Sequence, residues 1–261
     1  HRDLHSFPTR RSSDLARRGG SLPALIPAAV KDDGGPLRVG LLSSDFHDHA
    51  TALLLAETLE RHDPAQSAYF AYSFGRDDGG PMRRRLQAAC AGFVDIRDLG
   101  HKAAATRIRA DGVQVLIDLK GYTQGARPQI AALRPAPVQA QWLGYPGTMG
   151  ADFIDYILAD AVTAPFAHQK DYAEKIVHLP GCYQPNDSRR VIAAAPSRRA
   201  EVGLPEGAFV FCGFNAAYKL NPPSLDVWCG LLQAVPGSVL WLLDPGGEAA
   251  ANLRRAAAAR G

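Results

Sequence analysis

Apolar and polar positions alternate along the chain in blocks that predict short buried strands separated by amphipathic helices. From Leu37 onward, apolar runs of strand length recur between segments whose apolar residues follow helical spacing. Strands are predicted at 37–43, 68–74, 93–98, 113–119, 138–144, 156–160 and 175–180. Helices are predicted between them at about 52–62, 82–91 and 102–110. This order is typical of βαβ units built around a mostly parallel sheet.

The break at 181–207 is rich in Pro, Asn, Asp and Gly, which predicts an interdomain connection with one short helix. A second α/β pattern follows, with strands at 208–214 and 238–244 and helices at 223–235 and 248–260. Two strands and two helices are too few for an independent core of normal size. We therefore expect a first lobe at 37–185, a connection at 186–206 and an incomplete second lobe at 207–261, truncated at its C-terminus.

The N-terminal segment 1–15 differs in character from the rest. It contains Arg and Ser but no apolar core, so it is not a secretory signal. Its residues can be back-translated into a common sequencing adapter, and we hypothesise that it is not natural. Residues 16–36, rich in Gly, Pro and Ala, are expected to form a linker.

Composition narrows the class of partner. The chain has 261 residues, 46% of them hydrophobic, with a formal net charge of +3 and no long basic block. Neither nucleic acid nor membrane is therefore expected as the main partner, and no apolar run approaches the roughly 20 residues of a membrane helix. The four cysteines show no C-x-x-C spacing, which favours buried free thiols over disulfides or a metal site. We expect a cytoplasmic protein.

Candidate chemistry first appears after the strand 37–43, in the loop SSDFHDHAT (43–51). Polar side chains at the carboxyl end of a strand in an open α/β sheet occupy the usual ligand crevice. Asp45, His47 and His49 could suggest a metal, but three ligands within five residues and no distant partner make a poor site. From spacing alone, a functional and a structural role for the two histidines stay equally open.

Two further loops follow buried strands. DLKGYTQGAR (118–127) and LGYPGT (143–148) combine Gly with hydroxyl and cationic side chains. Backbone N–H groups and an Arg before a helix-starting Pro128 suit an anionic or hydroxyl-rich ligand, although each loop taken alone is more often a structural turn. Because loops after parallel strands share one sheet edge, their convergence is more specific. The candidate residues are Tyr122, Thr123, Gly125, Arg127, Gly144, Tyr145, Pro146, Gly147 and Thr148.

The second lobe offers one comparable loop, FNAAYKLNP (214–222), directly after the strand 208–214. Asn215, Tyr218 and Lys219 are its candidates, and the Lys219 ammonium is a point charge able to pair with a diphosphate. A surface lysine without function is the ordinary alternative. Asp111, by contrast, is expected only to cap a helix end or a turn.

The stretch 133–160, LRPAPVQAQWLGYPGTMGADFIDYILAD, resembles the catalytic region of the protein O-GlcNAc transferase family, which includes the SPINDLY proteins. Together with SSDFHDH, KGYTQGAR and FNAAYK, the matches run in order from about Leu37 to Asp244. The resemblance implies a GT-B glycosyltransferase with two Rossmann-like lobes. It also implies an inverting transfer of a sugar from a UDP-sugar to protein Ser or Thr hydroxyls, without a metal or other cofactor. The absence of a D-x-D motif at any strand end agrees with this.

The same resemblance assigns roles to individual residues. His49 matches the family's S-x-D-F-x-x-H pattern, whose His lies beside the reacting sugar and has been proposed as a general base. Lys219 matches the lysine that holds the nucleotide's phosphates. The loop at 121–127 matches one that lines the cleft opposite the donor. Metazoan members carry Gln at the position of Ala216, so that donor contact is absent here.

The resemblance also sets expectations for the parent protein. The short connection from Pro185 to Pro205 leaves no room for the animal-type insertion, so we expect a bacterial type, with N-terminal helical repeats in the parent. The family's nucleotide-reading residues lie beyond the strands present here, so we expect the fragment itself to bind UDP weakly and to be inactive. Other donors, GDP-fucose or UDP-glucose, and a non-catalytic peptide-binding relic remain as alternatives. No G-x-G-x-x-G follows the first strand, which disfavours a dinucleotide enzyme.

Overall fold

The structure is a computed structural model of the chain, and it describes residues 34–244 and 246–261. The adapter-like segment 1–15 lies outside the described residues, as does most of the predicted linker 16–36. The chain divides into two compact units, with the boundary between Arg190 and Val191. This boundary falls inside the segment that the sequence marks as a connection.

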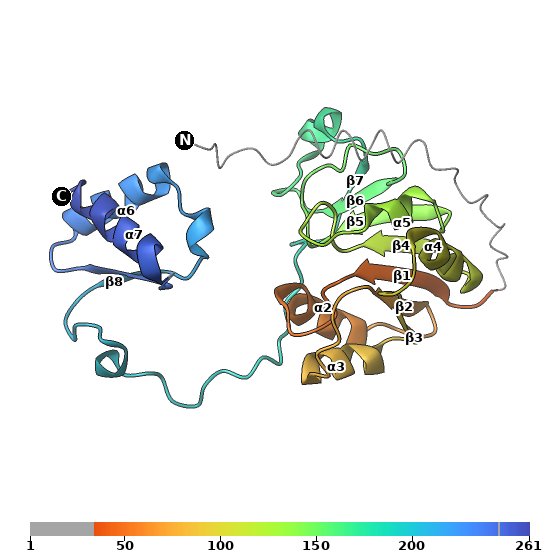
Figure 1. Cartoon of the computed structure of the whole chain (residues 1–261), viewed down its shortest axis with the longest axis horizontal. Helices are drawn as coiled ribbons and strands as arrows, with labels where there is room; N and C mark the ends of the chain where they lie inside the picture. The colour runs from red at the N-terminus through yellow and green to blue at the C-terminus, as the bar shows by residue number, and fades with distance from the viewer. Residues whose placement is uncertain (1–33, 245) are drawn as a thin grey trace. The chain divides into compact units, whose positions relative to one another are not determined.

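Unit 1 contains a seven-stranded sheet whose neighbouring strands are all parallel, in the order β3-β2-β1-β4-β5-β6-β7 (Figure 1). The strands are β1 (Leu37–Ser43), β2 (Ser67–Ser73), β3 (Gly92–Asp95), β4 (Val115–Asp118), β5 (Val138–Trp142), β6 (Tyr156–Ala159) and β7 (Lys175–His178). The predicted α/β class with a mostly parallel first-lobe sheet is therefore confirmed.

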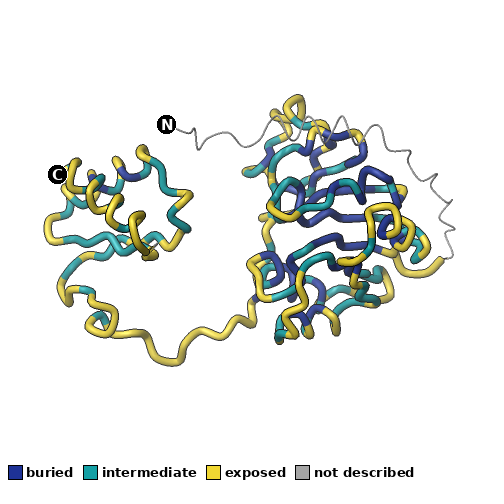
Figure 2. The backbone as a smooth tube through the Cα atoms, viewed as in Figure 1, coloured by how far each residue is buried: buried dark blue, intermediate teal, exposed yellow. Residues whose placement is uncertain are grey.

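Helices cover both faces of this sheet. Leu41 and Leu42 are consecutive on β1, so their side chains point to opposite faces, and both are buried. Residues of α2 and α3 share a core with Leu41, whereas residues of α4 and α5 share a core with Leu42. The helices are α2 (Ala50–Glu60), α3 (Pro81–Ala89), α4 (His101–Ala110) and α5 (Pro128–Ala132). Cover on both faces explains why the central strands are near-continuous apolar runs, drawn dark blue in Figure 2.

Several predicted bounds were too long, and the reasons are local. The strand expected at 93–98 ends at Asp95, because the Asp95 carboxylate accepts the backbone N–H of Arg97 at 3.0 Å and turns the chain. The short helix expected in 181–207 is the 3₁₀ turn η2 (Arg199–Val202). Asp111 is the C-cap of α4, as predicted, and also accepts a hydrogen bond from the Tyr72 hydroxyl.

The connection begins firmly attached to unit 1. Glu57 on α2 accepts hydrogen bonds from both the backbone N–H and the hydroxyl of Ser188, and these bonds lower its pKa. Arg85 on α3 bridges Glu60 and Asp187, and its hydrogen bond lowers the pKa of Asp187. The first residues of the connection are thus fixed on α2 and α3, and the long exposed stretch starts only after them (Figure 2).

Unit 2 has a smaller version of the same architecture. Its elements are β8 (Val210–Gly213), η3 (Ala217–Lys219), α6 (Pro222–Ala234), β9 (Val239–Leu242) and α7 (Gly247–Ala258). The two strands are parallel, as the second α/β pattern predicted. Among the described residues of this unit, the buried apolar side chains are Leu225 and Cys229. Phe214 packs edge-on against Trp241 yet stays 55% exposed, so the core of this unit is thin.

The cysteines are free, as predicted, but only one of them is buried. Cys229 is buried, Cys90 is half-buried, and Cys182 and Cys212 are exposed. Burial raises the pKa of the Cys90 thiol to about 12. The prediction of buried thiols was wrong for Cys182, which lies in an exposed segment after β7, and for Cys212, whose two-stranded sheet has little cover.

Within the described ranges, no helix combines the length and the apolar character needed to cross a bilayer. In the same ranges, no three His, Cys, Asp or Glu side chains gather closely enough to hold a metal ion.

Candidate functional site

The centre of the unit 1 sheet contains a topological switch point. The chain leaves β1 toward β2 and β3 on one side, and later leaves β4 toward β5 on the other side. The helix after β1 packs on one face and the short helix after β4 packs on the opposite face. Loops that diverge in this way open a crevice at the carboxyl ends of the strands, where open α/β sheets bind ligands. The predicted loops 43–51, 118–127 and 143–148 follow β1, β4 and β5, three adjacent strands, so all three lie at this edge.

The first loop presents His49 at the start of α2. His49 is the N-cap of that helix, and its Nδ1 accepts the backbone N–H of Thr51 at 3.2 Å. Asp45 is buried, with one carboxylate oxygen 3.7 Å from the same Nδ1. Burial, the largest influence, lowers the pKa of His49; Asp45 opposes this, and Lys120 and His47 add to it. His49 is therefore a neutral ring at neutral pH, with 42% of its side chain exposed.

A buried ion pair, which no sequence motif indicated, joins the first loop to the second. Lys120 Nζ donates to both oxygens of Asp45, at 3.1 Å and 2.9 Å, and both side chains are at least nine-tenths buried. Asp118 precedes this lysine and accepts its backbone N–H at 2.9 Å. Burial raises the pKa of Asp118 to about 6. A lysine directly after a buried strand was the available signal, because a buried lysine needs a partner charge.

The polar side chains of the second loop mostly hold the loop itself. The Tyr122 hydroxyl donates to the Met149 carbonyl at 2.8 Å, and the Thr123 hydroxyl donates to the Lys120 carbonyl at 2.9 Å. Burial raises the pKa of Tyr122 to about 12. Gly125 occupies the left-handed region at φ +77°. This loop therefore offers a ligand mainly its backbone.

Arg127 is turned away from the anion-binding role that its position before a helix suggests. Its guanidinium donates to the carbonyls of Ile96 and Leu99 and lies 5.8 Å from the ring centre of Phe74. Burial lowers the pKa of this guanidinium. In this structure Arg127 ties the second loop to the segment between β3 and α4.

The third loop packs closely on the second. Gly144 lies so near the backbone after β4 that a Cβ on it would stand 2.1 Å from the Leu119 carbonyl oxygen. Gly121 adopts φ +52° and faces the side chain of Tyr145, whose ring lies edge-on to Tyr122 at 5.8 Å. These contacts fix the relative positions of the two loops.

The end of the third loop is fixed by a fully buried carboxylate that sequence reasoning missed. Glu174 accepts the Thr148 hydroxyl and the Met149 backbone N–H, each at 2.7 Å. The Gly147 carbonyl accepts the side-chain N–H of Gln141 at 2.7 Å, and the Pro146 carbonyl accepts the Tyr172 hydroxyl at 3.4 Å. Thr148 therefore uses its hydroxyl within the fold.

Replacing Gly144 by alanine should destabilise unit 1 by about 2 kcal/mol, since the added methyl group forces the β4 and β5 loops apart. Urea unfolding of both proteins measures this loss. Gly100→Ala is the matched control, because nothing lies within 4 Å of a Cβ at that position; it should cost at most about 1 kcal/mol. Equal midpoints for Gly144→Ala and wild type would contradict the close approach.

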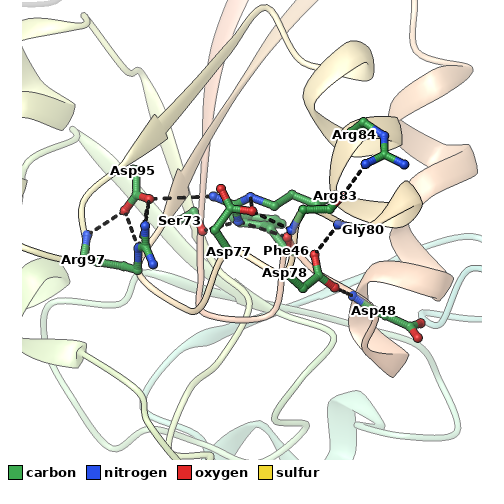
Figure 3. A network of polar contacts seen from close by, with 11 residues as sticks. Phe46, Asp48, Ser73, Asp77, Asp78, Gly80, Arg83, Arg84, Asp95 and Arg97 are labelled. Atoms are coloured by element: carbon green, nitrogen blue, oxygen red, sulfur yellow. Dashed lines mark hydrogen bonds and ion pairs between the residues drawn. The ribbon is translucent and has the colours of Figure 1, made fainter.

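A network of polar contacts around Arg83 holds the first loop (Figure 3). Arg83 on α3 is 2% exposed and donates to the Phe46 carbonyl and the Ser73 hydroxyl, both at 3.2 Å. Asp78 accepts the backbone N–H of Asp48 at 3.1 Å, a bond that lowers the pKa of Asp78. The loop before His49 is thus held at two points, by Arg83 on α3 and by Asp78 in the segment between β2 and α3.

In unit 2 the candidate residues follow β8, as predicted. Asn215 and Lys219 are exposed, and Tyr218 is 85% exposed. Lys219 ends the 3₁₀ turn η3, with its ammonium 6.0 Å from the ring centre of Tyr218. Two residues later, Asn221 caps α6 by accepting the Ser224 backbone N–H. The turn that carries Lys219 therefore leads into a capped helix.

Comparison with known proteins decides the family. The sequence model described as "Glycosyl transferase family 41" matches residues 23–198 and 191–261, which together cover most of the chain. The chain belongs to glycosyl transferase family 41. A solved family relative, a lysine-to-methionine mutant of the Thermobaculum terrenum O-GlcNAc transferase, has a TM-score of 0.84 and 29% sequence identity over 96% of this chain.

Curated relatives carry consistent names. This family 41 chain is 38% identical, over 95% of its length, to the probable UDP-N-acetylglucosamine–peptide N-acetylglucosaminyltransferase SEC of Arabidopsis thaliana. It is 32% identical, over 81% of its length, to the SPINDLY protein of the same plant. The chain spans 26% and 23% of these two relatives, and 48% of the Thermobaculum chain.

A more distant structure extends the likeness in fold alone. The lipopolysaccharide outer core galactosyltransferase WaaB matches 86% of the family 41 chain with a TM-score of 0.50 and 13% identity. Both structural neighbours are GT-B glycosyltransferases, so the predicted GT-B-type fold class is confirmed.

Proposed function

We propose that the protein containing this chain transfers N-acetylglucosamine from UDP-N-acetylglucosamine to Ser or Thr hydroxyls of acceptor proteins. The observation that carries the proposal is the family 41 match over both units, in relatives named as UDP-N-acetylglucosamine–peptide transferases. The three loops at the carboxyl edge of β1, β4 and β5 support it, because an open α/β sheet binds ligands there.

In the proposed reaction the acceptor hydroxyl oxygen bonds to the anomeric carbon while the bond from that carbon to the diphosphate breaks. Configuration inverts, the hydroxyl proton leaves, and UDP takes the electron pair of the broken bond. Lys219 binds the diphosphate and opposes the negative charge that grows on it. His49 lies beside the reacting sugar and orients or deprotonates the acceptor hydroxyl.

The other candidate residues are proposed to shape the sugar and acceptor sites. Gly144 to Thr148 and the loop from Tyr122 to Arg127 provide walls and backbone groups, because their side chains are largely committed within the fold. Asn215 and Tyr218 are proposed to contact the donor beside Lys219. No metal ion is assigned to the reaction, the acceptors are cytoplasmic proteins, and helical repeats elsewhere in the parent would help to bind them.

The test is a transfer assay on the longest reading frame that contains this chain, with a peptide library as acceptor. Radiolabelled UDP-N-acetylglucosamine, UDP-glucose and GDP-fucose are offered separately. The proposal expects label on Ser or Thr from the first donor at a rate well above the other two. Preference for another donor would replace the sugar, and no transfer from any donor would favour a peptide-binding relic.

A further inference from the structure

Lys120 and Asp45 lie next to His49, and the pair has no role in the function proposed so far. Lys120 comes from the end of β4 and Asp45 from the end of β1, so the ion pair spans the topological switch point. A cation and a carboxylate that are both buried need a strong structural or functional reason, because desolvation makes each of them costly. The third group at this point is His49.

The Asp45 carboxylate is already well supplied with donors. Its Oδ1 accepts the Ser44 hydroxyl at 2.7 Å and Lys120 Nζ at 3.1 Å, and its Oδ2 accepts Lys120 Nζ at 2.9 Å. The distance from Oδ2 to His49 Nδ1 is 3.7 Å, too long for a hydrogen bond. Lys120 therefore occupies the acceptor that would otherwise attract a proton on the imidazole.

The other partner of Nδ1 decides its protonation state. The Thr51 backbone N–H, which can only donate, points at His49 Nδ1 from 3.2 Å. The nitrogen must therefore present its lone pair, and the proton of the neutral ring is on Nε2. A protonated Nδ1 would leave this helix N-terminal N–H without its acceptor.

We infer that Lys120, by binding Asp45, is a positioning residue that keeps His49 in its Nε2–H tautomer, so that the neutral ring offers a hydrogen-bond donor. A general base acting through Nε2 needs a lone pair there, which requires a proton on Nδ1 and a free Asp45 to accept it. Lys120 removes that possibility by binding Asp45. His49 then donates from Nε2 to an oxygen of the acceptor or the sugar and orients it; this last role rests on the proposed function.

The groups that face His49 act together on its charge. Asp45 favours the imidazolium, whereas Lys120, His47 and burial of the ring favour the neutral form, and burial has the largest effect. His47 comes from the same loop, with its ring centre 5.6 Å from that of His49. Replacing Lys120 therefore removes the cation and leaves the Asp45 carboxylate facing the ring.

The first test is a long-range ¹H–¹⁵N spectrum of the ¹⁵N-labelled 261-residue chain above the pKa of His49. The eight histidines require assignment, which the His49→Gln variant provides by loss of one set of signals. The inference expects a protonated, pyrrole-type Nε2 and a pyridine-type Nδ1. The reverse pattern in the wild-type chain would overturn it.

The second test is a charge cycle at the ion pair. Lys120→Met should raise the pKa of His49 by about one unit, because Asp45 then faces the ring without its cation. Asp45→Asn should lower that pKa, and the double variant should bring it back toward the wild-type value. An unchanged His49 pKa in Lys120→Met would refute the coupling. If Lys120→Met does not fold, the coupling is tested by comparing the pKa of His49 in Asp45→Asn and in the double variant. Neither of these proteins has an Asp45 carboxylate that would be left buried without its cation.

These measurements need neither donor nor acceptor, so their outcome is independent of the transfer assay. A pyrrole-type Nε2 with no transfer activity would leave the positioning inference intact and remove the proposed function. Transfer activity with the reverse tautomer would do the opposite and restore His49 as a base.

Discussion

Replacing Lys219 by alanine in the transfer-competent protein is expected to lower kcat by about 10²- to 10³-fold. The ammonium follows β8 in the turn η3, just before the capped helix α6, and it is exposed and free to meet a ligand. A cation beside a departing diphosphate stabilises charge that exists mainly in the transition state. The measurement is steady-state transfer at saturating UDP-N-acetylglucosamine.

The distribution of this loss between kinetic parameters tests the role. An interaction made only in the transition state lowers kcat and kcat/KM equally, whereas uniform phosphate binding raises KM alone. Lys170→Ala, at an exposed lysine of unit 1, is the matched charge-removal control and should leave both parameters unchanged. A Lys219→Ala protein with wild-type kcat would remove this residue from the catalytic machinery.

The sequence predicted the site's position better than its internal chemistry. The apolar runs at 37–43 and 113–119 were predicted as strands, and they form β1 and β4 at the centre of the sheet, where cover on both faces demands continuous apolar residues. Once those strands are parallel, loops at their carboxyl ends must share an edge, and this part of the prediction was confirmed. The pairing of β1 with β4 was not predictable from local pattern, because strand order depends on packing over the whole sheet.

Because the strand order could not be predicted, contacts at the site between distant segments could not be predicted either. Lys120 and Asp45 are 75 residues apart and meet only because β1 and β4 are neighbours. Arg127 was assigned to a ligand by its place before Pro128, yet its guanidinium binds carbonyls in the segment after β3. Partners from distant segments compete for such side chains, and a motif alone does not reveal the competition. His49 also has a role that its motif did not reveal, because it caps α2 although His is not a usual N-cap residue.

Arg83→Met is expected to lower the free energy of unfolding of unit 1 by about 3 kcal/mol, because it removes the buried cation that several segments share. The Phe46 carbonyl and the Ser73 hydroxyl lose their donor, and the ring of Phe93 loses a guanidinium 4.8 Å from its centre. Asp77, 3.0 Å from Arg83 Nε, is 44% exposed, so water compensates part of its loss.

Arg84→Met provides a close control for this experiment, because Arg84 is the next residue on α3 and is exposed. Within the described residues, its side chain hydrogen-bonds to the Gly79 carbonyl alone. Its effect should stay within about 0.5 kcal/mol. Urea unfolding measures the free energy of unfolding of both variants, and the slope of that free energy against urea concentration should match wild type. Hydrogen exchange reports on the loop, because the amides of residues 46–49 should exchange faster in Arg83→Met than in Arg84→Met. Equal stability of the two variants would show that the Arg83 network does not hold the loop that carries His49, and the position of that histidine would then depend on the Lys120–Asp45 pair and the α2 cap alone.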